Sequence, residues 1–303
     1  MNLISITNSV LAVLLAPLMF GIINRTKAIF AGRTGQPLLQ TYYDISKLFK
    51  KGAVYSSTTT WVFLAGPLVG FAAVIAATVF IPFGGLPALF AFKGDFVVLA
   101  YFLGLARFMT VLSALDTGSS FEGMGASREV TFSALAEPAF LIGLAAVAKY
   151  TGHISLSPML TGIDSVSWGH AAPALALISL AFFVVLLSEN CRIPVDDPNT
   201  HLELTMIHEV MVLDHSGPDF AFILYGATLK LWLLGSILIG IIVPVHSGIL
   251  LLDIVSSLLG MLALAVVIGI IESIMARLRL LHVPQLLLGA TALSILALVL
   301  VSR

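Results

Sequence analysis

Ionisable side chains occur within, or at the ends of, several long apolar stretches of this 303-residue sequence. A charge inside a lipid bilayer costs several kcal/mol, so each of these groups is a candidate for function. A rise of about 1.5 Å per helical residue places most of them in the same half of the membrane. The candidates for a proton or charge pathway are Arg107, Asp116, Glu137, Glu189, Lys230 and Glu272.

Carboxylates and a lysine in this setting predict proton transfer. Burial and neighbouring charges bring the pKa values of such groups toward neutrality, so a chain of them can respond to a distant charge by shifting protons. Arginine does not titrate in this range, and Arg107 is therefore expected to be a fixed counter-ion for Glu137 or Asp116. The alternative for each residue is a structural ion pair that joins two helices.

Other residue types give weaker indications of chemistry. His201, His208 and His215 recur every seven residues, but His208 is not followed by the second histidine of a zinc-protease motif. Solvated histidines, or a pH-sensitive contact with a partner, are preferred to a metal site. The one cysteine, Cys191, is expected to be a packed side chain, because alone it cannot form an internal disulfide or hold an iron–sulfur cluster. We found no phosphate-binding, dinucleotide or nucleophile-elbow motif, and expect neither a catalytic centre nor a cofactor in this chain.

Membrane-spanning helices must position these groups. Hydrophobic residues make up 59% of the chain and charged residues 10%, with a mean hydropathy of +1.06, which excludes an ordinary soluble domain. Lipid offers backbone groups no partners and the apolar runs are too long for barrel strands, so an all-α integral membrane protein is predicted. It is expected to form a single membrane domain, residues 1–303, with eight spans near 3–23, 61–81, 96–115, 130–150, 171–189, 221–243, 250–273 and 284–301.

The distribution of Lys and Arg predicts how these spans are oriented. The first, third, fifth and seventh loops carry ten of these residues, whereas the other side carries only Lys93, Lys149 and Arg303. The odd-numbered loops are therefore predicted in the cytoplasm and both termini outside, in a multi-pass protein of the inner (cytoplasmic) membrane. The N-terminal run lacks a basic leader region, so we expect it to be kept as the first span.

Two of the predicted cytoplasmic loops have patterns of their own. Residues 37–51 form a predicted amphipathic helix with Asp44 on its polar face, either a plain interfacial anchor or one edge of a lateral opening toward the bilayer. Residues 188–220 form the longest loop, which is acidic and has Arg192 as its only Lys or Arg. A net charge of -1 for the chain gives no indication of a nucleic-acid partner. The carboxylates of the long loop include Asp196, Asp197, Glu203, Glu209, Asp214 and Asp219.

Four segments of the chain carry recognisable motifs: GLARFMTVLSALDTGSSFEGMGASREVTFSALAEP (104–138), SENCRIPVDD (188–197), LDHSG (213–217) and IESIMARLRL (271–280). They resemble the membrane subunit that respiratory complex I and group 4 membrane-bound hydrogenases have in common. The motif LDTGSSFEGMGASRE is more similar to the hydrogenase-4 and formate hydrogenlyase branch than to quinone-reducing complex I. The similarity extends over essentially the whole chain, and the family's fold of eight spans with an amphipathic helix after the first agrees with the predicted spans.

The resemblance implies that the chain anchors a peripheral redox arm and begins a charged axis that leads to antiporter-like subunits. Glu137 and Glu189 match buried acids of the family, and Asp116 matches the aspartate after the third span. Asn199 to His201 stand where relatives often carry a run of glutamates, and Glu203 is the most evident acid that remains, so it is counted with the charge pathway. Arg192, Pro194 and Asp196 match the Arg-x-Pro-x-Asp start of the family's coupling loop. With them, we expect at the coupling loop and peripheral-arm interface Arg25, Arg33, Asp44, Arg128, Glu129, Asp197 and Asp214.

We therefore predict a membrane-anchoring and ion-coupling subunit of a group 4 nickel–iron hydrogenase-like complex, in which redox chemistry drives proton or sodium translocation. Hydrogenase-like large and small subunits, an iron–sulfur subunit and antiporter-like membrane subunits are the expected partners, and they would carry the Fe-S clusters and a NiFe site. One alternative is the quinone-chamber subunit of a complex I-like dehydrogenase, with Arg25 and Arg33 lining a lipid-facing entrance for quinone. A stand-alone transporter would show repeated halves, which are not evident. A purely structural anchor is the remaining alternative.

Overall fold

The computed structural model describes residues 3–196, 207–244 and 248–302, and within these ranges the regular structure is helical apart from one isolated β-bridge. Eight of the described helices are long and apolar enough to cross a membrane, which confirms the prediction of an all-α integral membrane protein. The side of the membrane that each terminus faces stays a prediction. The long helices are α1 (Leu3–Phe30), α3 (Trp61–Thr78), α4 (Asp95–Asp116), α5 (Ser120–Thr151), α7 (Ser165–Glu189), α9 (Gly217–Ile242), α10 (Leu250–Ile274) and α11 (Val283–Val301). The short ones are α2 (Gln40–Phe49), α6 (Leu156–Thr161), α8 (His208–Met211) and the 3-10 helix η1 (Leu280–His282).

Three long helices extend beyond the predicted spans. Helix α5 begins at Ser120 rather than at 130, α7 begins at Ser165 rather than at 171, and α1 continues to Phe30 rather than ending at 23. A hydropathy pattern ends where polar residues begin, whereas in the folded chain caps and neighbouring helices accommodate those residues. Asp164, for example, caps α7 by accepting a hydrogen bond of 2.7 Å from the backbone N–H of Ser167.

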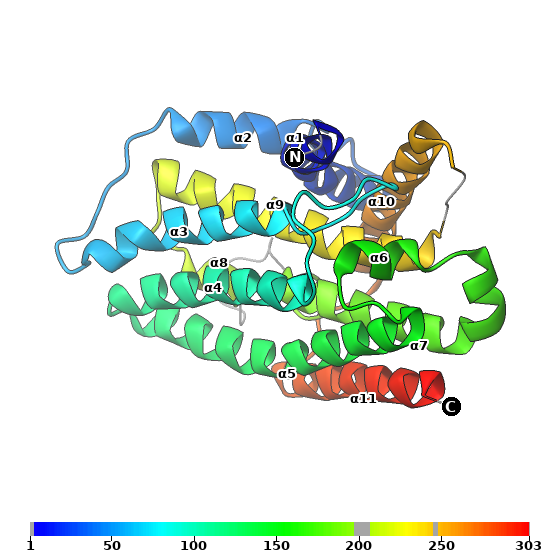
Figure 1. Cartoon of the computed structure of the whole chain (residues 1–303). Coiled ribbons are helices and arrows are strands. Elements are labelled where there is room, and N and C mark those ends of the chain that lie inside the picture. Colours follow the sequence, from blue (N-terminus) through cyan, green and yellow to red (C-terminus); the bar gives the residue numbers. More distant parts are fainter. Residues whose placement is uncertain (1–2, 197–206, 245–247, 303) are drawn as a thin grey trace.

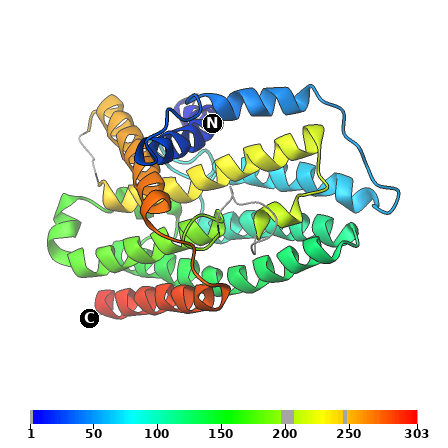
Figure 2. The same cartoon turned by 180° about the vertical axis from the view of Figure 1, so that it is seen from behind.

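The long helices are arranged in one bundle in which α10 is steeply inclined. Figures 1 and 2 show α3, α4, α5, α7, α9 and α11 running roughly alongside one another, while α10 crosses their direction steeply. Helix α1 packs against α10 and α9, α3 packs against α4 and α9, and α11 packs against α5 and α7. The end of the bundle at which α4 ends and α9 begins is named the basic end, because the loops and helix ends there carry most of the Lys and Arg residues.

Helix α9 runs through the middle of the bundle. It packs against α1, α2, α3, α6, α7 and α10, and 67% of its most apolar window is buried. A helix that is hydrophobic around its whole circumference is expected in the centre of a protein. Lys230 lies on this helix, so its ammonium group has to be neutralised by neighbouring side chains rather than by bulk water.

Glycines on α3 allow α4 to approach it closely beside the functional residues. A Cβ on Gly66 would lie 2.6 Å from the Cβ of Ser113, and a Cβ on Gly70 would lie 3.5 Å from the carbonyl oxygen of Ala106. A side chain at position 66 would push α4 outward, whereas a Cβ at position 70 would make an ordinary van der Waals contact with Ala106. The close approach at Gly66 therefore helps to set how near α4, which carries Arg107, lies to α3.

Candidate functional site

Arg107 on α4 lies among carboxylates from two other helices. Its Nη1 is 2.5 Å from Oε1 of Glu137 on α5, and its Nη2 is 2.7 Å and 2.6 Å from the two carboxylate oxygens of Glu189 at the end of α7. Its Nε is 3.5 Å from Oε1 of Glu129, also on α5. The planar guanidinium therefore contacts three carboxylates in different directions, a geometry that suits arginine better than lysine.

Lys230 adds a second cation to this group. Its Nζ lies 2.8 Å from Oε2 of Glu189, so that carboxylate is shared between Arg107 and Lys230. The group is named the Arg107 cluster and consists of Arg107, Glu129, Glu137, Glu189 and Lys230. With every member ionised it holds three negative and two positive charges. One additional proton would therefore make the Arg107 cluster neutral.

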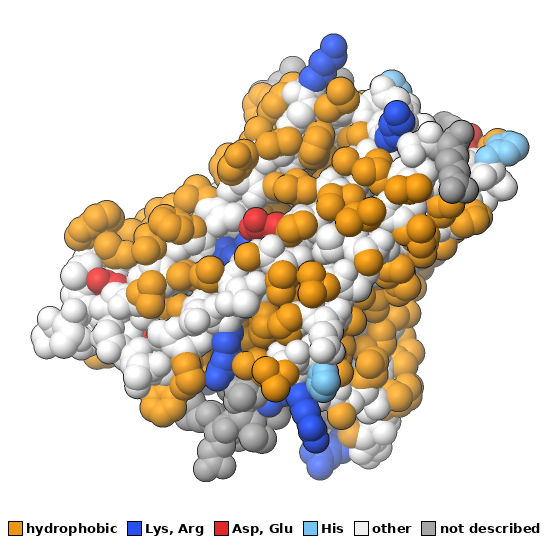
Figure 3. Space-filling model, turned by 90° about the horizontal axis from the view of Figure 1, so that it is seen from below, with side chains coloured by type: hydrophobic (Ala, Val, Ile, Leu, Met, Phe, Trp, Pro, Cys, Tyr) orange, Lys and Arg blue, Asp and Glu red, His pale blue; other side chains and the backbone are white. Residues whose placement is uncertain are grey.

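The members of the Arg107 cluster differ in exposure. The side chains of Glu189, Arg107 and Glu129 are 8%, 10% and 12% exposed, whereas the side chain of Glu137 is 54% exposed. Glu137 lines a hollow of about 520 Å³ formed by residues of α4, α5, α7 and α9, together with Arg107, Glu189, Tyr101 and apolar residues. Figure 3 shows an acidic and a basic side chain side by side in the middle of a largely hydrophobic face. Glu137 is thus the member of the cluster that reaches the outer surface of the bundle.

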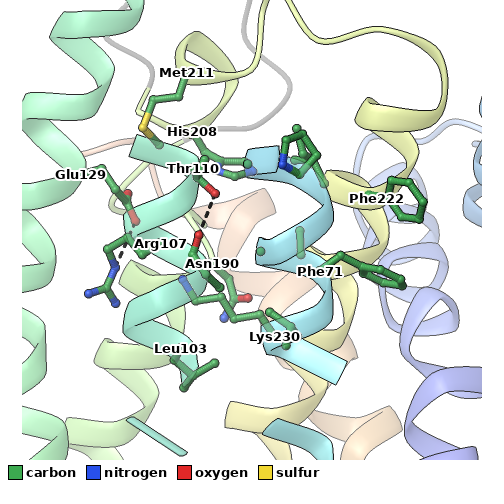
Figure 4. Close-up of a pocket in the computed structure, with 18 of the residues that line it drawn as sticks. Phe71, Leu103, Arg107, Thr110, Glu129, Asn190, His208, Met211, Phe222 and Lys230 are labelled. Carbon is green, nitrogen blue, oxygen red and sulfur yellow. Dashed lines mark hydrogen bonds and ion pairs between the residues drawn. The ribbon is translucent and has the colours of Figure 1, made fainter. Parts of the chain in front are cut away.

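A cavity of about 90 Å³ lies on the inner side of the Arg107 cluster. Figure 4 shows Arg107, Glu129, His208 and Lys230 around it, and the rings of Phe71 and Phe222 on another wall. One wall of the cavity is therefore charged and polar, and another is aromatic. The remaining polar lining comes from Thr110, Glu189, Asn190 and Cys191.

Two cavity residues outside the spans are held in their neutral forms. Burial, with the positive charge of Lys230, lowers the pKa of His208 to about 4. Burial, reinforced by the negative charge of Glu129, raises the pKa of the Cys191 thiol well above its usual value. The protonated thiol donates to Oε2 of Glu129 over 3.9 Å. Neither residue therefore adds a charge to the Arg107 cluster at neutral pH.

A second group of charges joins α1, α10 and the segment after α7. Nζ of Lys27 lies 2.8 Å from Oε2 of Glu272, and Nη1 of Arg192 lies 3.3 Å from Oε1 of the same carboxylate. The Arg192 guanidinium also stacks over the ring of Phe20, 4.2 Å from its centroid. Lys27, Arg192 and Glu272 are named the Glu272 cluster. Glu272 was expected in one pathway with Glu189 and Lys230, but its ion pairs belong to this separate group.

The segment from Glu189 to Arg192 connects the two clusters along the chain. Glu189 belongs to the Arg107 cluster, and Arg192, three residues later, belongs to the Glu272 cluster. Further along the segment, Oδ2 of Asp196 accepts a hydrogen bond of 2.6 Å from the backbone N–H of Ile207, and Oδ1 lies 3.6 Å from Nη1 of Arg277. A displacement of this segment would therefore move charges in both clusters.

Asp116 lies apart from both clusters. Its carboxylate accepts hydrogen bonds from the backbone N–H and the hydroxyl of Thr60, at 2.6 Å and 2.8 Å, and from the N–H of Phe63 at 3.2 Å. These are unpaired donors at the start of α3, where a negative charge is favoured. Of the two carboxylates expected as partners of Arg107, Glu137 pairs with it, whereas among the described contacts Asp116 is bound by Thr60 and Phe63 instead.

The histidines also differ from expectation. His215 is buried, stacks on Phe63 with ring centroids 4.0 Å apart, and shares a hydrogen bond of 2.9 Å with Ser113. Burial lowers the pKa of His215 to about 4. Of the two interpretations of these histidines, solvated side chains are wrong for His215, which is buried, and a pH-sensitive contact with a partner stays a prediction. His201 lies outside the described residues. Among the residues that the structure describes, no group of three or more His, Cys, Asp or Glu side chains could hold a metal ion.

Three residues expected at the peripheral-arm interface lie near the basic end of α1 and on α2. Arg25 donates from Nη1 to the carbonyl oxygen of Thr34. Arg33 lines a shallow exposed groove beside the end of α1. Asp44 accepts a hydrogen bond of 2.8 Å from Nε2 of Gln40 on the same helix. None of these contacts joins the Arg107 cluster.

The other expected interface residues are spread over two regions. Arg128 is partly exposed on α5, and the carbonyl oxygen of Pro194 accepts a hydrogen bond of 2.9 Å from the backbone N–H of Leu278. The backbone N–H of Asp214 donates to Oε1 of Glu122 over 3.3 Å. Asp197 and Glu203 lie outside the described residues.

Lys27 and Glu122 were overlooked as site candidates in the sequence. Lys27 was counted only for orientation, but α1 continues past it and brings it to Glu272. Glu122 is 1% exposed and precedes Glu129 by seven residues on α5. Two acids seven residues apart lie on the same helix face, so this spacing was the signal that could have identified Glu122 as buried.

Comparison with known proteins identifies relatives over the length of the chain. A family profile described as "NADH dehydrogenase" matches residues 3–302. Hydrogenase-4 component C of Escherichia coli K12 is 31% identical over 241 residues, which cover 79% of this chain and 75% of that protein. Formate hydrogenlyase subunit 4 of the same organism is 30% identical over 262 residues, covering 83% and 84%. These matches confirm the resemblance inferred from the four sequence segments.

A solved structure confirms the fold. A chain of the membrane-bound sulfane sulfur reductase, an archaeal respiratory membrane complex, superimposes with a TM-score of 0.83 at 19% sequence identity. The superposition covers 99% of this chain and 98% of that one. The arrangement of the helices is therefore preserved even where few side chains are shared.

Proposed function

The chain belongs to the NADH dehydrogenase family, and on that premise we propose that it is the membrane-anchoring and ion-coupling subunit of a group 4 nickel–iron hydrogenase-like complex. In this role it holds a peripheral redox arm at the membrane and links electron transfer there to proton or sodium translocation. The names of its relatives support a membrane subunit of a hydrogenase-like or complex I-like assembly. The more specific assignment to coupling rests on the Arg107 cluster.

The observation that carries the proposal is the charge imbalance of the Arg107 cluster. Three carboxylates face two cations in the interior of a membrane bundle, where a net charge is costly. Uptake of one proton removes the net negative charge of the cluster. When a positive charge arrives nearby, the proton is released again. The cluster can therefore exchange one proton in response to an electrostatic change.

Glu129 is the member that we assign to hold this proton. Arg107 Nε is its ion-pair partner at 3.5 Å, whereas Glu189 is bound by Arg107 and by Lys230 at distances below 3 Å. Glu137 is half exposed and pairs with Arg107 at 2.5 Å. Glu129 is buried and has the longest ion pair of the three carboxylates, so its protonation sacrifices the least ion-pair energy.

The Glu189–Arg192 segment is the proposed connection to the redox arm. We infer that the arm docks at the basic end, on the cytoplasmic side, and contacts the 188–220 loop and α2. A change in charge or position there is transmitted through Arg192 and Glu189 to the Arg107 cluster. Glu137, at the outer surface, passes the change to antiporter-like membrane subunits. The Fe-S clusters and NiFe site would belong to the hydrogenase-like partners.

A test compares electron transfer with ion translocation in the assembled complex. Glu137→Gln should leave assembly and electron transfer in detergent near the wild-type level, while ion translocation into proteoliposomes falls close to zero. Asp164→Asn is the matched control, because it also neutralises one carboxylate but keeps a capping residue at the opposite end of the bundle. Full translocation by the Glu137 variant would refute the coupling role.

The quinone-chamber alternative would use the same charged residues in a different way. Sites for drug-sized and cofactor ligands enclose about 300–1,000 Å³; the cavity on the inner side of Arg107 encloses about 90 Å³, whereas the outer hollow lined by Arg107, Glu137 and Glu189 encloses about 520 Å³. Bound quinone in the purified complex, in a one-to-one ratio, would favour the alternative.

A further inference from the structure

A separate groove lies between α1, α2 and α9, on the outside of the bundle. It encloses about 370 Å³ and is lined by Pro17, by Tyr225, by four residues of α2 and by Lys50, which directly follows that helix. The four α2 residues are Tyr42, Ile45, Ser46 and Phe49, and together with Lys50 they follow the i, i+3, i+4, i+7, i+8 spacing of one helix face. The groove therefore runs along α2 and ends at the last turn of that helix.

The two tyrosine hydroxyls beside the groove are hydrogen-bonded within the protein. Pro17 has no backbone N–H, so the carbonyl of Val13 lacks its usual partner in the helix. The hydroxyl of Tyr225 donates to this carbonyl over 2.6 Å, and the hydroxyl of Tyr42 donates to the neighbouring carbonyl of Leu14. Both tyrosines thus present ring surface to the groove, and its interior suits a hydrocarbon.

Aromatic rings close the inner end of the groove. Phe222 packs edge-on against Phe49 with ring centroids 5.2 Å apart, and Phe71 packs against Phe222 and Tyr225 at 5.3 Å each. Phe71 and Phe222 also line the cavity beside Arg107. These rings therefore separate the groove from the central cavity and close the groove at its inner end.

A cation marks the mouth of the groove. Lys50 is exposed at the end of α2, and among the described residues its ammonium group has no ion-pair partner. Lys47 is exposed on the same helix but does not line the groove. An apolar slot with a lysine at its entrance is complementary to a lipid that carries a negative headgroup.

We propose that this groove binds an anionic phospholipid, with one acyl chain between α1, α2 and α9 and the headgroup phosphate paired with Lys50. The occupant follows from the surroundings, because a chain with eight spans faces lipid on its outer surface and the slot opens there. The site is independent of the proposed ion coupling. It would join α2 to the bundle through a bound lipid.

Native mass spectrometry of the purified complex tests the site. After delipidation, the complex is titrated with phosphatidylglycerol and, separately, with phosphatidylcholine of the same chain length. We expect one tightly held phosphatidylglycerol, with about fivefold weaker retention in Lys50→Gln, the loss of one lysine–phosphate attraction. Lys50→Arg should retain the lipid, and Lys47→Gln, the matched control, should change retention little.

A second variant tests the acyl-chain slot itself. Ser46→Phe adds bulk at an exposed position that lines the groove, so it should reduce retention of both lipids without unfolding the protein. Equal losses in the Lys47 and Lys50 variants would show diffuse surface attraction and overturn the site. Unchanged retention in Ser46→Phe, or a quinone held there in place of phospholipid, would overturn it as well.

Discussion

Arg107 is the residue on which the electrostatics of the site depend. It contacts all three carboxylates of its cluster, and its side chain is 10% exposed. Removing one partner of a buried ion pair leaves an uncompensated charge, whereas removing both partners together is much less costly. The contribution of Arg107 to protein stability can therefore be measured separately from proton exchange in the Arg107 cluster.

The first prediction is that Arg107→Gln destabilises the protein by about 3–5 kcal/mol, because Glu189 then keeps only Lys230 as a buried partner. The double variant Arg107→Gln/Glu189→Gln should regain a large part of that loss, since cation and carboxylate leave together. Unfolding of the purified protein in denaturant measures both values. Simple addition of the two single-variant losses would show that the pair is not coupled.

The second prediction concerns His215 and pH. Because burial lowers its pKa from 6.5 to about 4, the unfolded chain binds a proton at this position between those values and the folded chain does not. The contribution of His215 to the free energy of unfolding is therefore fully present above pH 6.5. It falls as the pH drops toward 4, with a slope of at most about 1.4 kcal/mol per pH unit from this group.

His208 shifts in the same direction, so His215→Gln should remove about half of the acid-side slope rather than all of it. Melting temperatures between pH 4 and pH 7.5 measure the slope. His153→Gln, at an exposed histidine, is the control and should leave the slope unchanged. An unaltered slope in the His215 variant would contradict the assignment of a buried neutral imidazole.

At the scale of the elements, the ends of helices explain why some carboxylates have other partners than predicted. Asp116, at the end of α4, is used to cap α3, and Asp164 caps α7. A sequence pattern shows that a carboxylate lies near the end of a span. It does not show whether that carboxylate will bind a backbone N–H or a distant arginine in the folded protein.

The third prediction follows from this capping role. Asp116→Ala should lower stability by about 1 kcal/mol, since the backbone N–H groups of Thr60 and Phe63 at the start of α3 lose their acceptor, but ion translocation per electron should stay at the wild-type ratio. Asp116→Asn should lose less stability, because asparagine also caps helices. If Asp116→Ala stopped translocation in a folded complex, this residue would belong to the charge pathway after all.

Much of the fold was predictable because lipid restricts it. The absence of water inside a bilayer requires helices of about 20 apolar residues, and eight such runs are visible in the sequence. The starts of α5 and α7 were missed because polar residues there lie within helices. Such residues acquire partners only after packing, which hydropathy does not describe.

The candidate site was predictable in part. The residues Arg107, Glu137, Glu189 and Lys230 stood out as charges within apolar runs, and the structure brings them together. Glu272 was assigned to the same path but pairs with Lys27 and Arg192. Glu272 lies on α10, which crosses the direction of most other long helices steeply, and no local sequence pattern records that crossing.

At the scale of the whole molecule, the two clusters lie on either side of a short connecting segment. The Arg107 cluster joins α4, α5, α7 and α9, and the Glu272 cluster joins α1, α10 and the residues after α7. A partner that displaces the Glu189–Arg192 segment therefore acts on most long helices at once. This arrangement suits a subunit that converts an event at the basic end into a charge movement inside the membrane.

The most direct test is redox-induced infrared difference spectroscopy of the assembled complex, which detects the carbonyl stretch of a protonated carboxyl group. The fourth prediction is a band that changes when the redox arm is reduced, that disappears in Glu129→Gln and that persists in Asp164→Asn. Such a band would identify the exchangeable proton of the Arg107 cluster. A band that is unchanged in Glu129→Gln, or no redox-dependent carboxyl band in the wild type, would contradict the account.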